Sequence, residues 1–260
     1  SLIPQGFKDH VDFNTNVEHE YKNKIIDYFI LNGFDLIKTP MIEFYENNSD
    51  NCLFIETRKN KPKLFIRDDI TPQIIRIASS RFKNKKRPIK LCYYGEVVRN
   101  KGTMLRPERQ FLQVGSEIIG SNSILADIEI INLAYKSLKK IGVNNITLEL
   151  TSKKFLAEIF SKIKDNKILK KLKTYVKQKD KRNSLSLIKN KNHKIFLENL
   201  FDLSGNIDNF NKNIYSLGIS NITKKEIKNL KDISKNINLS SEDQIIFDFT
   251  EIDNKITMMV

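Results

Sequence analysis

Apolar side chains in the first third of the chain recur with two different spacings, which predict helices and strands in alternation. The spacing over residues 16–33 is near the helical period, and residues 34–39 form a strand-like run that stops at Pro40. A second helix is predicted to open at Thr71, with the Thr71 side chain as its cap and Pro72 in its first turn. The beginning of the chain therefore combines both kinds of secondary structure.

Residues 90–120 give the clearest pattern. They predict two strands, 91–99 and 109–119, joined by a polar loop that contains glycine and proline, so the strands are expected to pair antiparallel. Successive strand side chains lie on opposite faces. One face of the second strand carries Arg109, Phe111, Gln113, Gly115 and Glu117, and the other carries Gln110, Leu112, Val114, Ser116 and Ile118. The first face offers hydrogen-bonding groups to a small polar ligand.

The remaining chain continues the mixture and then becomes mainly helical. A further helix is predicted over residues 124–138, and two further strands are predicted over residues 146–150 and 244–250. A lysine-rich helical stretch is predicted over residues 153–240. Polar breaks interrupt the helical stretch near residues 183–184, 204–206 and 218–221. The predicted fold class is α+β, with an antiparallel sheet flanked by helices.

The same pattern predicts how the chain divides. Residues 1–152 form the core, residues 153–240 a basic helical subdomain, and residues 241–260 return to the core as a strand.

Charge is distributed unevenly along the 260 residues. The formal net charge is +14, but residues 1–150 carry a net charge of only +5. Residues 153–194 hold 15 basic and 3 acidic residues. This block is interpreted as a solvated helical surface or a docking face for an acidic partner. A nucleic-acid-binding module is a third reading, although the block has no basic strand studded with aromatic residues.

Cysteine and histidine residues are few and scattered. Cys52 and Cys92 lie too far apart for a metal-binding or redox pair, and His10, His19 and His193 show no zinc-ligand spacing. No window approaches the roughly 18 uninterrupted apolar residues of a membrane-spanning helix, and the N-terminus has no leader pattern. We expect a cytoplasmic protein without a metal site or a cofactor.

Four segments in order resemble a known family. They are residues 2–9 (LIPQGFKD), 67–73 (RDDITPQ), 91–99 (LCYYGEVVR) and 106–120 (RPERQFLQVGSEIIG). Together with the helix and the strand that stops at Pro40, they resemble motifs one and two of class II aminoacyl-tRNA synthetases. They are similar to the histidyl-tRNA synthetase lineage, and closer still to its non-catalytic paralogue, the ATP phosphoribosyltransferase regulatory-subunit family. The resemblance covers about residues 2–160.

The resemblance implies a histidine pocket made of five residues and no catalytic residue. Asp69, Thr71 and Gln113 match the positions that hold the α-amino group, Glu117 matches the one that faces the imidazole, and Arg99 matches the arginine of motif two. Taken singly, Thr71 could be only a helix cap and Asp69 only a solvated loop residue. Gln113 or Glu117 could be only a partner of backbone groups. Their joint occurrence in register favours the pocket.

Two features depart from a working synthetase. Lys101 stands where the adenylating enzymes carry an acidic residue, and of the basic residues of that loop only Arg106 and Arg109 remain nearby. Residues 247–251 resemble the lead-in to the segment that closes the pocket, and the chain then ends at Val260. We expect the closing segment, motif three and the anticodon-binding domain to be missing.

Two functions from different classes follow from the resemblance. The first is a non-catalytic regulatory subunit that joins the short-form catalytic subunit of ATP phosphoribosyltransferase, self-associates as a dimer through the motif-one face, and supports feedback by histidine on the first step of histidine biosynthesis. The second is a truncated or minimal histidyl-tRNA synthetase catalytic domain, which adenylates histidine and charges tRNA.

Overall fold

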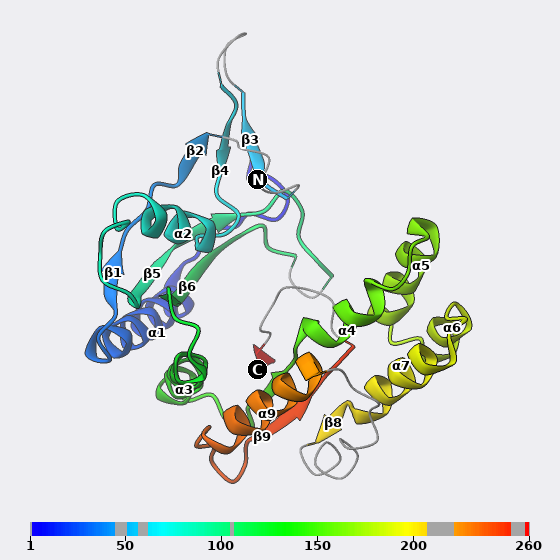
Figure 1. Cartoon of the computed structure of the whole chain (residues 1–260). Helices are drawn as coiled ribbons and strands as arrows, with labels where there is room; N and C mark the ends of the chain where they lie inside the picture. The colour runs from blue at the N-terminus through cyan, green and yellow to red at the C-terminus, as the bar shows by residue number, and fades with distance from the viewer. Residues whose placement is uncertain are drawn as a thin grey trace. The chain divides into compact units, whose positions relative to one another are not determined.

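A computed structural model, drawn in Figure 1, describes residues 2–44, 51–56, 62–104, 107–206, 221–250 and 258–259. The chain divides into two compact units, Ser1–Gly142 (unit 1) and Val143–Val260 (unit 2). The domain boundaries expected after residues 152 and 240 stay a prediction. Arg106 and residues 251–257, which the sequence analysis discussed, lie outside the described residues.

Unit 1 contains three helices and two three-stranded sheets in its described part. The elements are α1 (Asp12–Leu31), β1 (Asp35–Ile37), β2 (Ile42–Phe44), β3 (Leu53–Ile55), β4 (Leu64–Ile66), α2 (Thr71–Ser79), β5 (Ile89–Val98), β6 (Gln110–Ile119) and α3 (Ile124–Lys140). One sheet has the order β1-β5-β6, in which β1 runs parallel to β5 and β5 antiparallel to β6. The other is fully antiparallel, with the order β2-β4-β3.

The predicted strand pair of residues 91–99 and 109–119 is confirmed as the ten-residue pairing of β5 with β6. One face of this pair packs on α2 and the other on α1 and α3 (Figure 1). Phe111 packs with the α2 cluster, whereas Val114 and Ile118 pack with the α1 and α3 cluster, as the alternation predicted. Each fully buried aliphatic or aromatic side chain stabilises such a sandwich by roughly 1.5–3 kcal/mol. The two-sided packing holds the strand pair rigidly.

Local signals fix the ends of the flanking helices. Gly33 has a φ of +83°, a left-handed conformation that suits glycine, and it follows α1 as the predicted stop. Ser123 caps α3, because its hydroxyl accepts a hydrogen bond from the Leu125 amide at 3.2 Å. Two lysines, Lys139 and Lys140, lie in the last turn of α3, where they face the negative end of the helix dipole.

Unit 2 combines a small sheet with a series of short helices. Its elements are β7 (Thr147–Leu150), α4 (Lys153–Phe160), α5 (Asn166–Lys177), α6 (Lys181–Ser186), α7 (Lys191–Leu203), β8 (Gly205–Asn206), α9 (Asn221–Lys235), β9 (Gln244–Phe247) and β10 (Met258–Met259). The sheet has the order β10-β7-β9-β8, and β7 pairs parallel with β9. Both units mix helices with sheets, which confirms the predicted α+β class.

The segmentation of these helices follows their polar caps. Asp165 caps α5 by accepting from the Lys167 amide at 2.8 Å, and Asp180 caps α6 by accepting from the Asn183 amide at 3.0 Å. The break predicted near residues 183–184 is therefore wrong, because α6 runs through it and its actual start is set by Asp180. The break at residues 204–206 is confirmed by the end of α7. Most of the break at 218–221 lies outside the described residues.

Three further observations concern membrane, metal and redox chemistry. In the described part of the chain, no helix is both long and apolar enough to cross a membrane. Over the same residues, no three or more histidine, cysteine, aspartate or glutamate side chains gather in a way that would hold a metal ion. Cys52 and Cys92 are unbridged and buried.

Candidate functional site

Polar side chains gather where the start of α2 meets the middle of β5 and β6. The segment before α2 supplies Asp69, Thr71 is the first residue of α2, and β6 supplies Gln113 and Glu117. A fifth residue, Tyr93 of β5, contacts Thr71 and Glu117. The structure thus brings together four of the five predicted histidine-binding residues. We call these four residues and Tyr93 the α2–β6 cluster.

Asp69 and Gln113 hold each other in place. The Gln113 amide nitrogen donates to Asp69 Oδ1 at 2.8 Å, and the Gln113 amide oxygen accepts from the Ile70 backbone N–H at 3.0 Å. The Thr71 backbone N–H also donates to Asp69 Oδ1, at 3.0 Å. These bonds fix the orientation of both side chains without a ligand.

Thr71 contacts the second carboxylate instead of capping its helix. The residue at the cap position of α2 is Ile70, which makes no side-chain cap hydrogen bond, and Thr71 is the first helical residue, so the predicted capping role of Thr71 is wrong. Its hydroxyl donates to Glu117 Oε1 at 3.1 Å and lies 2.9 Å from the Tyr93 hydroxyl. Tyr93 also donates to Glu117 Oε1, at 3.2 Å. The helix instead starts with Pro72 in its first turn, as predicted.

Burial governs the electrostatics of this cluster. Burial raises the pKa of Glu117 above its ordinary value, the hydrogen bonds from Thr71 and Tyr93 oppose the rise, and the charge of Asp69 adds to it. Burial also raises the pKa of the Tyr93 phenol, so this hydroxyl keeps its proton at neutral pH. Tyr93 therefore acts as a neutral hydrogen-bond donor beside a carboxyl group whose pKa is raised.

Each carboxylate has one oxygen left over for a ligand. In the described part of the chain, no group donates to Asp69 Oδ2 or to Glu117 Oε2, and neither oxygen is among the fully buried unpaired atoms. Thr71 contacts both carboxylates, through its backbone N–H and through its hydroxyl. The cluster thus offers two acceptors to a small ligand that carries two cationic or N–H groups.

Arg99, the fifth predicted residue, lies at the end of β5 and makes a different contact. Its guanidinium stacks over the Phe111 ring, 4.7 Å from the ring centroid, and its backbone N–H donates to the Arg109 carbonyl at 2.8 Å. Among the described residues, Arg99 forms no ion pair with a carboxylate. Phe111 shares the β6 face that carries Gln113 and Glu117, so the Arg99 guanidinium lies over the same face as these two residues.

Tyr93 is a site residue that the sequence pattern did not predict. On β5 it pairs with Gly115, and a Cβ atom added to Gly115 would lie 2.5 Å from the Tyr93 ring. The missing side chain makes room for the tyrosine ring over β6. An isolated glycine in the middle of a strand signals such a close approach, so Gly115 was the clue in the sequence.

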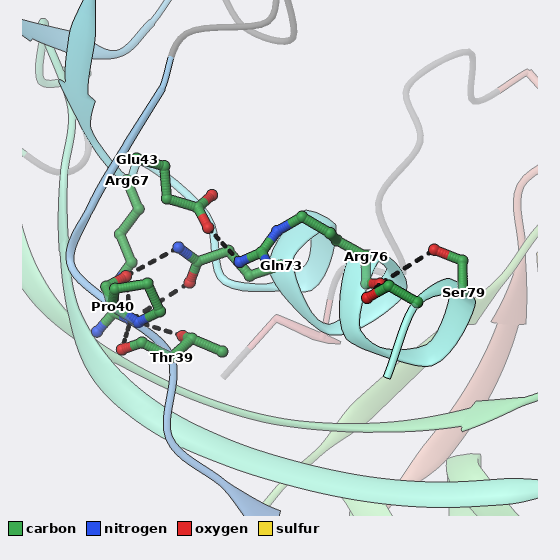
Figure 2. A network of polar contacts seen from close by, with 8 residues as sticks. Thr39, Pro40, Glu43, Arg67, Gln73, Arg76 and Ser79 are labelled. Carbon is green, nitrogen blue, oxygen red and sulfur yellow. Dashed lines mark hydrogen bonds and ion pairs between the residues drawn. The ribbon is translucent and has the colours of Figure 1, made fainter. Parts of the chain in front are cut away.

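Arg67 was also missed as a structural anchor of the cluster (Figure 2). It is only 6% exposed, and its guanidinium donates to the Glu96 carbonyl at 2.8 Å and to Thr39 Oγ1 at 2.8 Å. Gln73 of α2 joins the network by donating to the Pro40 carbonyl at 2.8 Å. Because these bonds tie β5 and α2 to the segment after β1, they fix both ends of the turn that carries Asp69.

A cavity of about 450 Å³ lies beside the loop between β5 and β6. Its lining includes Gln5 and Gly6 of the N-terminal segment, Lys101 and Gly102 of the loop, and Arg109. Arg109 is already engaged, because Nε donates to the Arg99 carbonyl at 3.0 Å and Nη1 to the Gln5 carbonyl at 3.3 Å. Of the described basic residues here, Lys101 alone extends into solvent without such a bond from its side chain.

Known proteins resemble this chain over most of its length. A family model described as histidyl-tRNA synthetase matches residues 6–255. An ATP phosphoribosyltransferase regulatory subunit of Rhodospirillum centenum is 35% identical over 159 residues, covering 58% of this chain and 41% of the relative. Its namesake in Clostridium botulinum is 30% identical over 272 aligned positions, covering 96% of this chain and 62% of the relative. The chain spans less than two thirds of either relative.

Solved structures share the fold at low sequence identity. The "ATP phosphoribosyltransferase regulatory subunit/histidyl-tRNA synthetase" of Bacillus halodurans C matches with a TM-score of 0.82 and 21% identity, over 96% of this chain and 68% of that one. Histidyl-tRNA synthetase of Nostoc sp. PCC 7120 matches with a TM-score of 0.75 and 15% identity, over 95% and 61%. The ATP phosphoribosyl transferase (HisG:HisZ) complex of Thermotoga maritima matches with a TM-score of 0.67 and 17% identity, over 92% and 82%.

These likenesses confirm the class II synthetase-like fold that the sequence predicted. The match to the family model extends through both units, and the curated relatives share the name of regulatory subunit. The chain belongs to the histidyl-tRNA synthetase family, in which its relatives include ATP phosphoribosyltransferase regulatory subunits.

Proposed function

We propose that this chain acts as a non-catalytic regulatory subunit of ATP phosphoribosyltransferase, which binds histidine and transmits its presence to a separate catalytic subunit. The names of its relatives support the role. The contact of Thr71 with both carboxylates of the α2–β6 cluster carries the proposal, because it brings two acceptors to the same residue at the start of α2.

Histidine matches the cluster in each of its polar groups. Its α-ammonium group is a donor for Asp69 Oδ2, and a ring N–H is a donor for Glu117 Oε2. Its carboxylate is a partner for the guanidinium of Arg99, which has a planar fork of donors. An amino acid without a ring N–H leaves Glu117 Oε2 without a donor in the complex, which costs affinity.

Binding is tested by titrating the purified protein with histidine while its thermal stability is followed. A ligand that binds only the folded state raises the melting temperature as its concentration increases. We expect stabilisation by histidine and none by leucine at the same concentration. Equal melting curves with and without histidine would contradict the proposed site.

The proposed partner is the short-form catalytic subunit, which transfers a phosphoribosyl group from phosphoribosyl pyrophosphate to ATP. The Thermotoga maritima ATP phosphoribosyl transferase, a complex of HisG with HisZ, supports such an assembly. Feedback requires histidine to bind the assembly states with unequal affinity. We expect the chain to stimulate the activity of the purified catalytic subunit and to make it sensitive to histidine. A catalytic subunit that behaves identically with and without the chain would contradict this role.

Self-association through the motif-one side is part of the proposal. One face of the sheet β2-β4-β3 is apolar at every position, and none of its side chains is buried: Ile42, Phe44, Leu53, Ile55, Leu64 and Ile66. An uncharged, flat face matches a second copy of itself across a two-fold axis. We expect a dimer by light scattering and a monomer after the substitution Phe44→Asp, with Ile195→Asp on α7 as the control for an exposed apolar residue elsewhere.

The alternative is histidine adenylation and tRNA charging, which the description of the family model favours. Lys101 opposes it, because the loop position that carries an acidic residue in adenylating enzymes is basic here. Histidine-dependent exchange of pyrophosphate into ATP separates the two functions, and the regulator is expected to show none. A cytoplasmic location is also part of the proposal, supported by the two unbridged cysteines.

A further inference from the structure

Three oxygens in the α2–β6 cluster lie within hydrogen-bonding distance of one another. The Thr71 and Tyr93 hydroxyl oxygens are 2.9 Å apart, and Glu117 Oε1 lies 3.1 Å from the first and 3.2 Å from the second. Thr71 comes from α2, Tyr93 from β5 and Glu117 from β6. Three separate elements therefore converge on one carboxylate oxygen.

The number of protons in this triangle depends on the state of Glu117. When Glu117 is ionised, the two hydroxyls supply only two protons for three contacts, so one pair of oxygens meets without a proton between them. When Glu117 is protonated on Oε1, three protons serve three contacts and the ring is complete. With Glu117 protonated, every contact among the three oxygens thus has a proton. With Glu117 ionised, one of the three contacts lacks a proton, so the oxygens can accept a further hydrogen bond from a ligand.

We propose that Tyr93 is a positioning residue of this site, whose hydroxyl holds Glu117 by Oε1, leaves Oε2 for a ligand N–H, and couples ligand binding to ionisation of Glu117. The inference rests on the proposed histidine site. Tyr93 is suited to this part because its ring is fixed over Gly115, where a Cβ atom would come within 2.5 Å of the ring and the hydroxyl oxygen. Its hydroxyl is held in place by packing and needs no ligand to orient it.

The groups that face Glu117 determine the sign of the coupling. In the described part of the chain, the titratable groups placed against it are Asp69, from the segment before α2, and Tyr93, from β5. The charge of Asp69 disfavours ionisation of Glu117, and the hydrogen bond from Tyr93 favours it. Loss of the Tyr93 hydroxyl therefore raises the pKa of Glu117 and extends its neutral form to higher pH.

The substitution Tyr93→Phe tests the proposal, because it removes the hydroxyl and keeps the ring over Gly115. Binding is measured by calorimetry between pH 5 and 8, with histidine and with an analogue whose triazole ring stays neutral over this range. We expect affinity for the analogue to fall by about tenfold near the acid end, because Glu117 is less ionised there in the variant and a ligand N–H bonds a charged carboxylate more strongly than a neutral one. The acid limb of its pH profile should move to higher pH.

Tyr94→Phe is the matched control. Tyr94 is the next residue of β5, on the opposite face, where its ring lies under the Lys22 ammonium group at 4.7 Å. This variant should bind as the unaltered protein does. Carbon-13 NMR of the Glu117 carboxyl group, recorded without ligand, gives a second readout, and its titration should move to higher pH in Tyr93→Phe alone.

The outcomes separate this inference from the proposed function. If the unaltered protein binds neither ligand, the proposed histidine site fails and the coupling fails with it. If it binds and Tyr93→Phe binds with the same affinity and pH profile, only the role of Tyr93 is overturned. Gly115→Ala keeps the hydroxyl and displaces the ring, so a folded Gly115→Ala variant with unchanged binding also overturns it.

Discussion

Unit 1 and unit 2 use charged residues in opposite ways. Around the α2–β6 cluster, the few charged groups are half-buried or buried and bonded to specific partners, as Arg67 and Glu117 illustrate. On α5 the lysines are numerous and exposed, including Lys167, Lys170 and Lys171. Unit 1, which has the smaller net charge, therefore contains the more specific polar contacts. A hydrogen bond or ion pair is stronger in a buried site because the local dielectric constant is low.

Removal of the buried cation in unit 1 should have the largest effect. Arg67→Met leaves the carbonyls of Thr39 and Glu96 without their donor, and we expect the free energy of unfolding to fall by about 3 kcal/mol. Arg76→Met removes an exposed guanidinium that pairs with Glu43, and should cost less than about 1 kcal/mol. Urea denaturation measures both. Equal losses would mean that burial does not distinguish the two arginines.

Asp248 tests whether unit 2 contains a charge of the same kind. It is buried at the end of β9, pairs with Lys179, and accepts from the Thr250 backbone N–H at 2.8 Å and hydroxyl at 2.6 Å. We expect Asp248→Ala to cost about 2 kcal/mol, less than for a fully buried pair because the Lys179 side chain is half-exposed. Asp202→Ala, which removes an exposed partner of Lys181, is the control and should cost well under half as much.

Glu117 tests whether a half-buried charge of unit 1 contributes to histidine binding. Glu117→Gln preserves shape but removes the charge that strengthens a hydrogen bond from a ligand N–H, so histidine affinity should fall by at least about tenfold. Calorimetry at neutral pH measures the change. Glu129→Gln, on α3 beside Lys90, is the control and should bind histidine normally. Unaltered affinity in Glu117→Gln would remove this residue from the site.

The same residue should give stability a pH dependence. Because the pKa of Glu117 is raised in the folded protein, the folded state binds more protons than the unfolded one between the ordinary glutamate value of about 4.3 and the raised value. The free energy of unfolding should thus decrease as pH rises through that window. Denaturation at a series of pH values should show a flatter profile for Glu117→Gln than for the unaltered protein.

The lysines of α5 should have the smallest effect. The triple substitution of Lys167, Lys170 and Lys171 by glutamine removes three exposed charges, and we expect stability to change by less than about 0.5 kcal/mol with histidine affinity unchanged. A large loss of binding to the catalytic subunit at low salt would instead identify α5 as a docking face for an acidic partner. Sedimentation of the mixed subunits at two salt concentrations measures this.

Particular residues show how far sequence patterns reach. The alternation along β6 placed Gln113 and Glu117 on one face, and the antiparallel pairing of β5 with β6 followed from the loop between them. Thr71 looked like a helix cap because its type and its place before Pro72 fit that role, yet its hydroxyl bonds Glu117 instead. A side chain of a given type can hydrogen-bond to several kinds of partner, and the neighbours that pack around it decide which of these bonds forms.

The sequence alone determined the three helices of unit 1, the two long strands with their faces and the family to which the chain belongs, since periodicity and motif order are local properties of the chain. The short strands β2 and β3 were not predicted. Tertiary structure decided that Tyr93 lies over Gly115, that Arg67 ties β5 to the segment after β1, and that Thr71 meets both Asp69 and Glu117. These contacts join residues that are distant along the chain, and they depend on strand register and burial, which a single sequence does not encode in any local pattern.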